Sequence, residues 1–265
     1  MKNKFTSFYL DNPLVRGRIF DVFEPESITR DIAILFIHGG GWRAGSRTSF
    51  HEIMQAFSKQ GYLTATADYR LDAKNAFDQL SDIRAAYDGL VSFLKEKGLP
   101  VKIAVFGESA GAHLASLLLC AAPGECGEKN ELINEWVPPH MGILQSTPAS
   151  FKLWEGMLPS LEKAMKSIAG ADFCDNPEVY EKLSLCNYIS KSNPPIFFME
   201  AELEHMFLSK YTLEIVKKHR NMGIMSHWKV YEGMEHGFFF ELRRNAQKEA
   251  FEDICGFLEG KLTTL

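Results

Sequence analysis

Residues 102–120 read KIAVFGESAGAHLASLLLC, and this stretch decides the fold. Its first part, 102–106, suits a buried strand, and the residues from Ala110 onward suit an apolar helix. Between them stands GESAG at 107–111, a GxSxG sequence. Such a sharp strand-to-helix turn pushes the serine hydroxyl out of the sheet, and its glycines leave room for neighbouring backbone. The stretch therefore predicts a nucleophilic Ser109 on an α/β unit.

Short apolar runs alternate with helix-like segments along the rest of the chain, which is typical of βαβ units around a mostly parallel sheet. We expect strands at 32–37, 62–68, 102–106, 141–145, 196–199 and 228–231. We expect helices at 50–60, 77–97, 110–120, 208–219 and 244–258. The alternating stretch 15–23 indicates an antiparallel edge strand or hairpin. No repeat or linker divides the chain, so we expect a single domain over 1–265.

The interval 146–193 is too long for a plain βα connection. Apolar residues recur in it at helical spacings of four and three: Trp154, Leu158, Leu161, Met165 and Ile168. This pattern predicts an inserted helix with one apolar face. The helix either covers the sheet or forms a small lid over a pocket, and the sequence leaves both interpretations open.

Composition excludes several classes of protein. The 265 residues are 46% hydrophobic and 24% charged, as in a globular enzyme. Lys plus Arg is 29 and Asp plus Glu is 34, and this net charge of −5 disfavours nucleic acid and membrane surfaces as partners. The most apolar run, 114–122, is far shorter than the ~20 residues that span a bilayer.

Targeting and redox signals are weak. The N-terminus turns polar at Thr6 and Ser7 rather than entering an apolar signal sequence, so we expect no export. The five cysteines are scattered without a CxxC pair, which disfavours disulfides and structural zinc. His51-Glu52 lacks the second histidine of an HExxH zinc helix. The sequence thus predicts a cytoplasmic protein with no metal.

A glycine cluster follows the strand expected at 32–37 and reads HGGGW at 38–42. Consecutive glycines let backbone N–H groups approach a developing oxyanion closely. We therefore expect an oxyanion hole formed by the N–H groups of Gly40, Gly41 and Ala110. A phosphate-binding loop is disfavoured because neither Gly-Lys-Ser/Thr nor GxGxxG is present.

The general base should follow the nucleophile and the acid in the chain. Five histidines lie downstream of the serine: His140, His205, His219, His227 and His236. His140 and His227 stand at strand entrances and His219 lies on a basic helical segment, so we expect these three on the surface. His236 follows the last strand in a loop with glycines on both sides, which makes it the predicted base.

The acid should come from the loop after the strand at 196–199, which offers Glu200, Glu202 and Glu204. Glu204 lies on the turn into the next helix and is favoured, although the other two stay open. Two further groups have structural interpretations. His113 should be a satisfied core histidine, and a buried polar brace should form from Asp68-Tyr69-Arg70 with Asp82 and Arg84.

Four motifs together resemble the α/β-hydrolase superfamily: HGGGW at 38–42, DYRL at 68–71, GESAGAHLA at 107–115 and EHGF at 235–238. They are most similar to small bacterial carboxylesterases of the hormone-sensitive-lipase-like branch, including acetyl-xylan and feruloyl esterase relatives. The resemblance implies an α/β-hydrolase fold with a mostly parallel eight-stranded sheet, helices on both faces, a serine-histidine-acid triad and no cofactor. The chain departs from the usual Gly-x-x-Asp by reading AELE at 201–204, so its acid is a glutamate.

The combined reading is a serine hydrolase of short-chain carboxylic esters that uses Ser109, His236 and Glu204. We expect Trp42, Phe151 and Trp154 to line the substrate pocket. An amidase or formamidase with the same triad is the alternative within enzymes. A non-catalytic binding protein on this fold is the alternative from another class, disfavoured because all three residues are present. The expected partner is a small-molecule ester, and a homodimer stays open.

Overall fold

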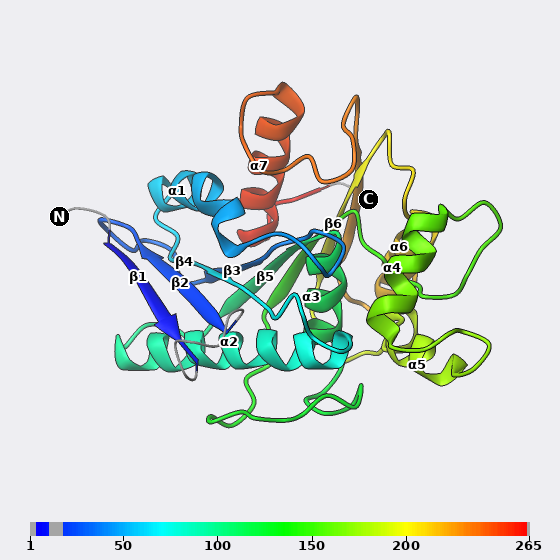
Figure 1. Ribbon diagram of the computed structural model, residues 1–265. Coiled ribbons are helices and arrows are strands. Elements are labelled where there is room, and N and C mark those ends of the chain that lie inside the picture. Colours follow the sequence, from blue (N-terminus) through cyan, green and yellow to red (C-terminus); the bar gives the residue numbers. More distant parts are fainter. Residues whose placement is uncertain (1–3, 11–17, 264–265) are drawn as a thin grey trace.

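The computed structural model describes residues 4–10 and 18–263, which form one eight-stranded sheet with helices on both faces (Figure 1). The strand order is β1-β2-β4-β3-β5-β6-β7-β8. The pairs β1·β2 and β2·β4 are antiparallel, and the strands from β4 to β8 are parallel to one another. The strands are β1 (Lys4–Tyr9), β2 (Ile19–Glu24), β3 (Ala33–Ile37), β4 (Thr64–Ala67), β5 (Ile103–Glu108), β6 (Met141–Gln145), β7 (Ile196–Ala201) and β8 (His227–Tyr231).

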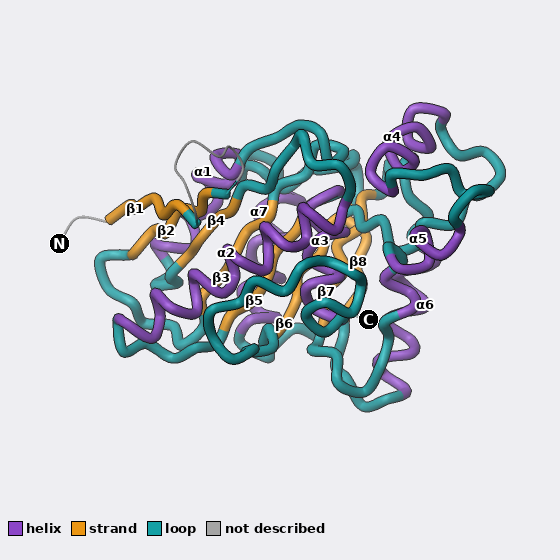
Figure 2. The backbone as a smooth tube through the Cα atoms, turned by 60° about the horizontal axis from the view of Figure 1, so that its bottom comes forward, coloured by secondary structure: helices purple, strands orange, loops and turns teal. Residues whose placement is uncertain are grey.

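Two groups of helices cover the sheet, and Figures 1 and 2 show them on opposite sides of it. Side chains of α1 (His51–Lys59) and α7 (Asn245–Leu258) pack in the core under one face. Side chains of α2 (Ala76–Glu96), α3 (Ala110–Cys120) and α6 (Lys210–Asn221) pack in the core under the other. The segment between β6 and β7 adds α4 (Pro159–Ala169) and α5 (Pro177–Lys182). Two 3-10 helices complete the set, η1 (Arg47–Phe50) and η2 (Leu185–Asn187).

Strand β3 shows why the central strands read as continuous apolar runs. Its side chains at Ala33, Leu35 and Ile37 enter the core under α2 and α3, whereas Ile34 and Phe36 enter the core under α1 and α7. A parallel strand covered on both faces has no solvent side, so every position is apolar. This pattern makes the central parallel strands predictable, and all six parallel strands are found within two residues of their expected limits.

Local signals set the ends of the helices. Asn75 caps α2, because its side-chain oxygen accepts hydrogen bonds from the N–H groups of Phe77 and Asp78. Helix α4 begins with Pro159 and ends at Gly170, whose φ of 76° lies in the left-handed region that glycine adopts freely.

Two expectations about the elements need correction. The alternating stretch 15–23 corresponds to β2, which starts at Ile19, while 15–17 lies outside the described residues. This strand is antiparallel to its neighbours, as predicted, but it lies between β1 and β4 and is not the edge strand. The inserted helix begins at Pro159 rather than near Trp154, so only the later residues of the apolar pattern lie on its buried face: Leu161, Met165 and Ile168. None of the helices within 4–10 and 18–263 is long and apolar enough to span a membrane.

Candidate active site

The GxSxG turn joins β5 to α3 and depends on both of its glycines. Ser109 has φ 51° and ψ −118°, a conformation that L residues rarely adopt and that only surrounding packing can hold. A Cβ on Gly107 would lie 2.6 Å from the Cα of Ala112, and a Cβ on Gly111 would lie 2.2 Å from the carbonyl oxygen of Ile37. The close packing of helix on strand therefore requires glycine at both positions.

Ser109, His236 and Glu204 form one hydrogen-bonded chain across the loops that follow β5, β8 and β7. Ser109 Oγ lies 2.8 Å from His236 Nε2, and His236 Nδ1 lies 2.7 Å from Glu204 Oε2. The other carboxylate oxygen of Glu204 accepts the N–H of Met206 at 2.8 Å. An ionised carboxylate can only accept, so Nδ1 of the neutral imidazole carries the proton and Nε2 accepts from the serine hydroxyl.

The electrostatics of these hydrogen-bonded residues favour an ionised Glu204 beside a protonated His236. Burial alone would raise the pKa of Glu204, but the hydrogen bond with His236, the histidine charge and the Met206 N–H hold it below its usual value. Burial alone would lower the pKa of His236, but the hydrogen bond and charge of Glu204, helped by Glu108 and Glu200, raise it. The site therefore stabilises an imidazolium, the species that a general base becomes.

The two other candidate acids have different partners. Glu202 Oε2 accepts the N–H of Gly233 at 2.7 Å at the protein surface. Glu200 is buried and accepts the hydroxyl of Thr212 at 2.6 Å, and burial raises its pKa to about 8. Of the three carboxylates, only Glu204 is hydrogen-bonded to His236.

The glycine loop after β3 presents free N–H groups beside the site. Gly40 and Gly41 have φ of 107° and 57°, and the carbonyl of Gly40 accepts the N–H groups of Arg43 and Ala44. Within the described residues, the N–H groups of Gly40, Gly41 and Ala110 donate to no other group. These are the three donors that the sequence predicts for an oxyanion hole.

Two of the predicted pocket residues lie in the core instead. Trp42 and Phe151 are 1% and 0% exposed, and their rings are 5.6 Å apart. The Trp42 indole donates to His113 Nδ1 at 3.1 Å, and His113 Nε2 lies 2.8 Å from the carbonyl of Leu183, so His113 is the satisfied core histidine that was expected. Trp42 and Phe151 thus expose no surface to a substrate. Trp154 is partly buried against the same core and remains a predicted pocket residue.

Two of the three histidines expected on the surface are buried. His140 is exposed as expected. His219 is 0% exposed, with its Nδ1 2.8 Å from Ser226 Oγ, and His227 is 5% exposed. Burial lowers the pKa of His219 to about 4, so this residue is a neutral hydrogen-bonding group of the core. Its sequence neighbours Lys217 and Lys218 are exposed, so the basic composition of this segment conceals the burial of His219.

The expected polar brace exists with different pairing. Arg70 binds Asp82, with Nε 2.9 Å from Oδ2, so these two members of the predicted brace are joined. Arg84 instead binds Glu128, with Nε 2.6 Å from Oε1 in the core. Asp68 binds Arg47, which follows the glycine loop.

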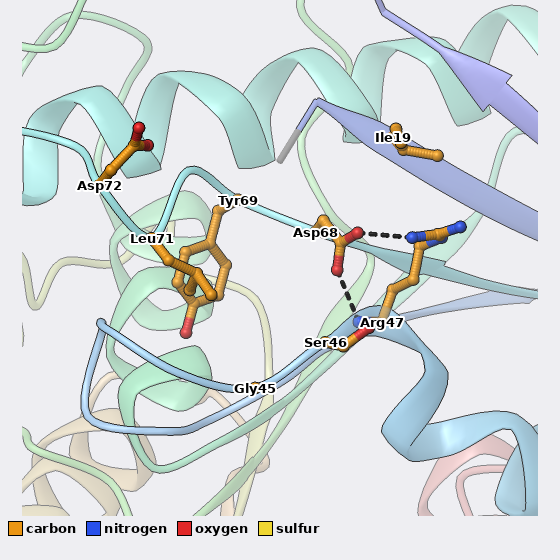
Figure 3. A pocket seen from close by; sticks show the side chains of 8 residues that line it. All are labelled: Ile19, Gly45, Ser46, Arg47, Asp68, Tyr69, Leu71 and Asp72. Carbon is orange, nitrogen blue, oxygen red and sulfur yellow. Dashed lines mark hydrogen bonds and ion pairs between the residues drawn. The ribbon is translucent and has the colours of Figure 1, made fainter. Parts of the chain in front are cut away.

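A cavity of about 530 Å³ lies between the glycine loop and the loop after β4 (Figure 3). The hydroxyl of Tyr69, one of its lining residues, donates to the carbonyls of His38 and Gly39. Arg47 crosses it to Asp68 in an ion pair. The cavity is lined by Ile19, Gly45, Ser46, Arg47, Asp68, Tyr69, Leu71 and Asp72. It does not include the serine, histidine or glutamate of the hydrogen-bonded chain.

Glu108 is a buried carboxylate beside the site that the motifs do not single out. The signal for it was present, because Glu108 is the one charged residue in β5, an otherwise apolar strand. Within the described part of the chain, no cluster of three or more His, Cys, Asp or Glu side chains is arranged to hold a metal ion.

The family model of BD-FAE matches residues 20–207, which include the glycine loop, the GxSxG turn and Glu204. The chain belongs to the BD-FAE family. This membership confirms the resemblance to hormone-sensitive-lipase-like α/β-hydrolases. Among curated proteins, this BD-FAE chain is 23% identical to the esterase LipQ of Mycobacterium tuberculosis over 93% of the chain, and 28% identical to LipM of the same organism over 65%. It spans only 61% of the length of LipQ and 41% of that of LipM.

Solved structures share the fold of this BD-FAE protein. Esterase B from Lactobacillus rhamnosis superimposes with a TM-score of 0.81 at 17% identity, covering 98% of this chain and 86% of that one. Esterase 2 from Thermogutta terrifontis, with propionate bound, superimposes with a TM-score of 0.77 at 22% identity, covering 98% and 96%. These similarities confirm the predicted α/β-hydrolase fold.

Proposed function

We propose that this BD-FAE protein is a serine hydrolase that cleaves short-chain carboxylic esters. The observation that carries the proposal is the hydrogen-bonded chain from Ser109 through His236 to Glu204, with distances of 2.8 and 2.7 Å. A nucleophile, a base and an orienting acid at such distances are what acyl transfer requires. LipQ and the two structural neighbours named above are called esterases, which supports the same chemistry.

The first half of the reaction forms an acyl-enzyme. Ser109 Oγ attacks the ester carbonyl carbon while its proton passes to His236 Nε2, and Glu204 stabilises the resulting imidazolium. In this proposal the oxyanion accepts hydrogen bonds from the N–H groups of Gly40, Gly41 and Ala110, which have no other acceptor among the described residues. His236 then gives its proton to the departing alcohol oxygen as the carbon–oxygen bond of the ester breaks.

The second half releases the acid. Water attacks the acyl carbon, its proton passes to the same imidazole nitrogen, and the bond to Ser109 Oγ breaks as this oxygen takes the proton back. No step needs a cofactor. We further propose that the segment 146–193, which holds α4 and α5, is the lid insertion of this single domain.

Covalent labelling tests the proposal. A fluorophosphonate probe should modify the native protein at a single peptide, the one that holds Ser109, and should stop hydrolysis of p-nitrophenyl acetate measured in EDTA. Heat-denatured protein is the control and should not react. Absence of both labelling and turnover would contradict the proposal and leave a binding protein. Faster turnover of N-formyl amides than of all esters tested would favour an amidase.

We expect a preference for acyl chains of about two to six carbons, because each further CH₂ needs about 0.8 kcal/mol of apolar contact and the insertion is small. Trp42 and Phe151 are already packed in the core and offer no apolar contact to a longer acyl chain. Structures of Thermogutta terrifontis esterase 2 hold propionate and butyrate. The check is kcat/KM for p-nitrophenyl esters of increasing length. A higher value for the twelve-carbon ester than for acetate and butyrate would contradict it.

The rate should rise with pH through the pKa of His236, since only the neutral imidazole accepts the serine proton. Because Glu204, Glu108 and Glu200 together raise this pKa, the acidic limb of kcat/KM should lie above pH 6.5. The measurement is a pH–rate profile on p-nitrophenyl acetate at constant ionic strength. An acidic limb well below pH 6.5 would show that the carboxylates do not act on the base as described.

A further inference from the structure

Glu108 stands immediately before Ser109 and its carboxyl occupies the space between two loops of the site. The residue is 5% exposed. A Cβ on Gly39 would lie 1.8 Å from Glu108 Oε2, and a Cβ on Gly237 would lie 2.8 Å from Oε1. The carboxyl therefore fits only because residue 39, in the glycine loop, and residue 237, directly after His236, are both glycines.

The carboxyl also binds one of these loops directly. The N–H of Gly39 interacts with the Glu108 side chain and lowers the pKa of its carboxyl. From the other side, the Tyr69 hydroxyl donates to the carbonyls of His38 and Gly39. The residue that precedes the two predicted oxyanion donors, Gly40 and Gly41, is thus held at both its N–H and its carbonyl.

The same carboxyl lies near the reactive nitrogen of the base. Glu108 Oε1 is 3.8 Å from His236 Nε2, on the side of the ring opposite to Glu204. Within the described residues, His236 is the only cationic group within 4.0 Å of this carboxyl. The groups that act on Glu108 are His236, the Gly39 N–H and Glu204. Burial outweighs the first two and raises its pKa to about 7.

We propose that Glu108 is a positioning residue of the esterase reaction. Its carboxyl holds the glycine loop against the loop after β8 that carries His236, and its charge stabilises the protonated His236. The inference rests on the proposed function. It assigns the imidazolium two counter-charges, Glu204 at Nδ1 and Glu108 near Nε2, where the sequence indicates only one. Glu200 also raises the pKa of His236, but its carboxyl is hydrogen-bonded to Thr212 and touches neither loop.

Two substitutions separate the charge from the contact. Glu108→Gln keeps an acceptor for the Gly39 N–H and loses the charge. Its His236 pKa should fall by about 1 unit, moving the acidic limb of kcat/KM to lower pH, and kcat should fall by up to about tenfold with little change in KM. Glu108→Asp keeps the charge but withdraws it by one methylene. It should lower kcat and leave the acidic limb near that of the parent.

The control is Glu202→Gln, which neutralises an exposed carboxylate that binds Gly233 and does not act on His236. This variant should change neither kcat nor the pH at which the acidic limb of kcat/KM lies. The His236 pKa is also read by NMR titration of the imidazole, assigned by comparison with His236→Gln. This titration needs no turnover, so it tests Glu108 even if the parent cleaves no ester, a result that would contradict the proposed function instead.

A pKa of His236 in Glu108→Gln within about 0.2 units of the parent value would overturn the proposal. An equal loss of activity at every pH in Glu108→Gln and Glu108→Asp would also overturn the proposal, because a purely structural role of Glu108 produces that result. If circular dichroism shows that Glu108→Gln does not fold, Glu108→Asp decides alone. A kcat for Glu108→Asp equal to that of the parent would then overturn the proposal.

Discussion

Replacing Ser109 by alanine is expected to lower kcat for p-nitrophenyl acetate by about five to six orders of magnitude. The variant keeps the free N–H groups near the site but has no oxygen to form the acyl-enzyme. The change removes one hydroxyl whose hydrogen bond goes to His236, so the fold should persist. Steady-state kinetics give the loss, and circular dichroism with the melting temperature shows that the protein is folded.

Ser116 provides the matched control. It lies on α3, the helix that Ser109 immediately precedes, is also buried, and its hydroxyl donates to the carbonyl of His113 at 2.7 Å. Ser116→Ala should keep activity within a few-fold of the parent. If a folded Ser109→Ala protein hydrolyses the ester at the parent rate, then Ser109 is not the nucleophile and the proposed mechanism is wrong.

The central strands of the sheet were predictable because burial on both faces determines the composition of each strand by itself. A parallel strand buried on both faces must be apolar throughout, as in 33–37, and this shows in the sequence without knowledge of its neighbours. Strand β1 lacks that signal, because it is an edge strand with polar side chains at Lys4, Thr6 and Ser7, and β2 is its only partner among the strands of the described residues. Its pairing depends on a contact that the composition of 4–9 does not indicate.

The residues that the structure corrects depend on distant partners. Arg84 pairs with Glu128, 44 positions away, whereas Asp82 stands nearer in the sequence and binds Arg70. His219 is buried, and its ring nitrogens lie 2.8 Å from Ser226 Oγ and 3.3 Å from Oδ1 of Asn193, which stands 26 positions away. Such partners are fixed by tertiary packing, so no spacing rule for the single segment could have found them.

The choice between Glu202 and Glu204 shows how far motif spacing can go. The motif places an acid just after β7, but the direction of each side chain depends on one turn. In the structure the N–H of Glu204 donates to the carbonyl of Ala201 at 3.2 Å, which closes this turn immediately after the strand. The turn directs Glu204 to His236, while Glu202 binds Gly233.

Glu204→Gln is therefore expected to lower kcat by about four orders of magnitude with little change in KM. A glutamine can donate to Nδ1 through its amide, which favours the tautomer with the proton on Nε2, where it cannot accept from Ser109. The charge that raises the pKa of His236 is lost as well, so any residual activity should have its acidic limb at lower pH. The measurements are kcat, KM and the pH–rate profile on p-nitrophenyl acetate.

The matched control is Glu202→Gln, which makes the same replacement of a carboxylate oxygen by an amide nitrogen two positions away. It removes a charge from an exposed hydrogen bond to the N–H of Gly233 and leaves the amide oxygen to accept that bond. Its kcat should stay within about twofold of the parent, since the tautomer and charge of His236 are untouched. If Glu202→Gln is instead the crippled variant and Glu204→Gln retains activity, then the turn after β7 directs the other carboxylate to the imidazole during turnover. The assignment of Glu204 would then be wrong, whereas the roles proposed for Ser109 and His236 would stand.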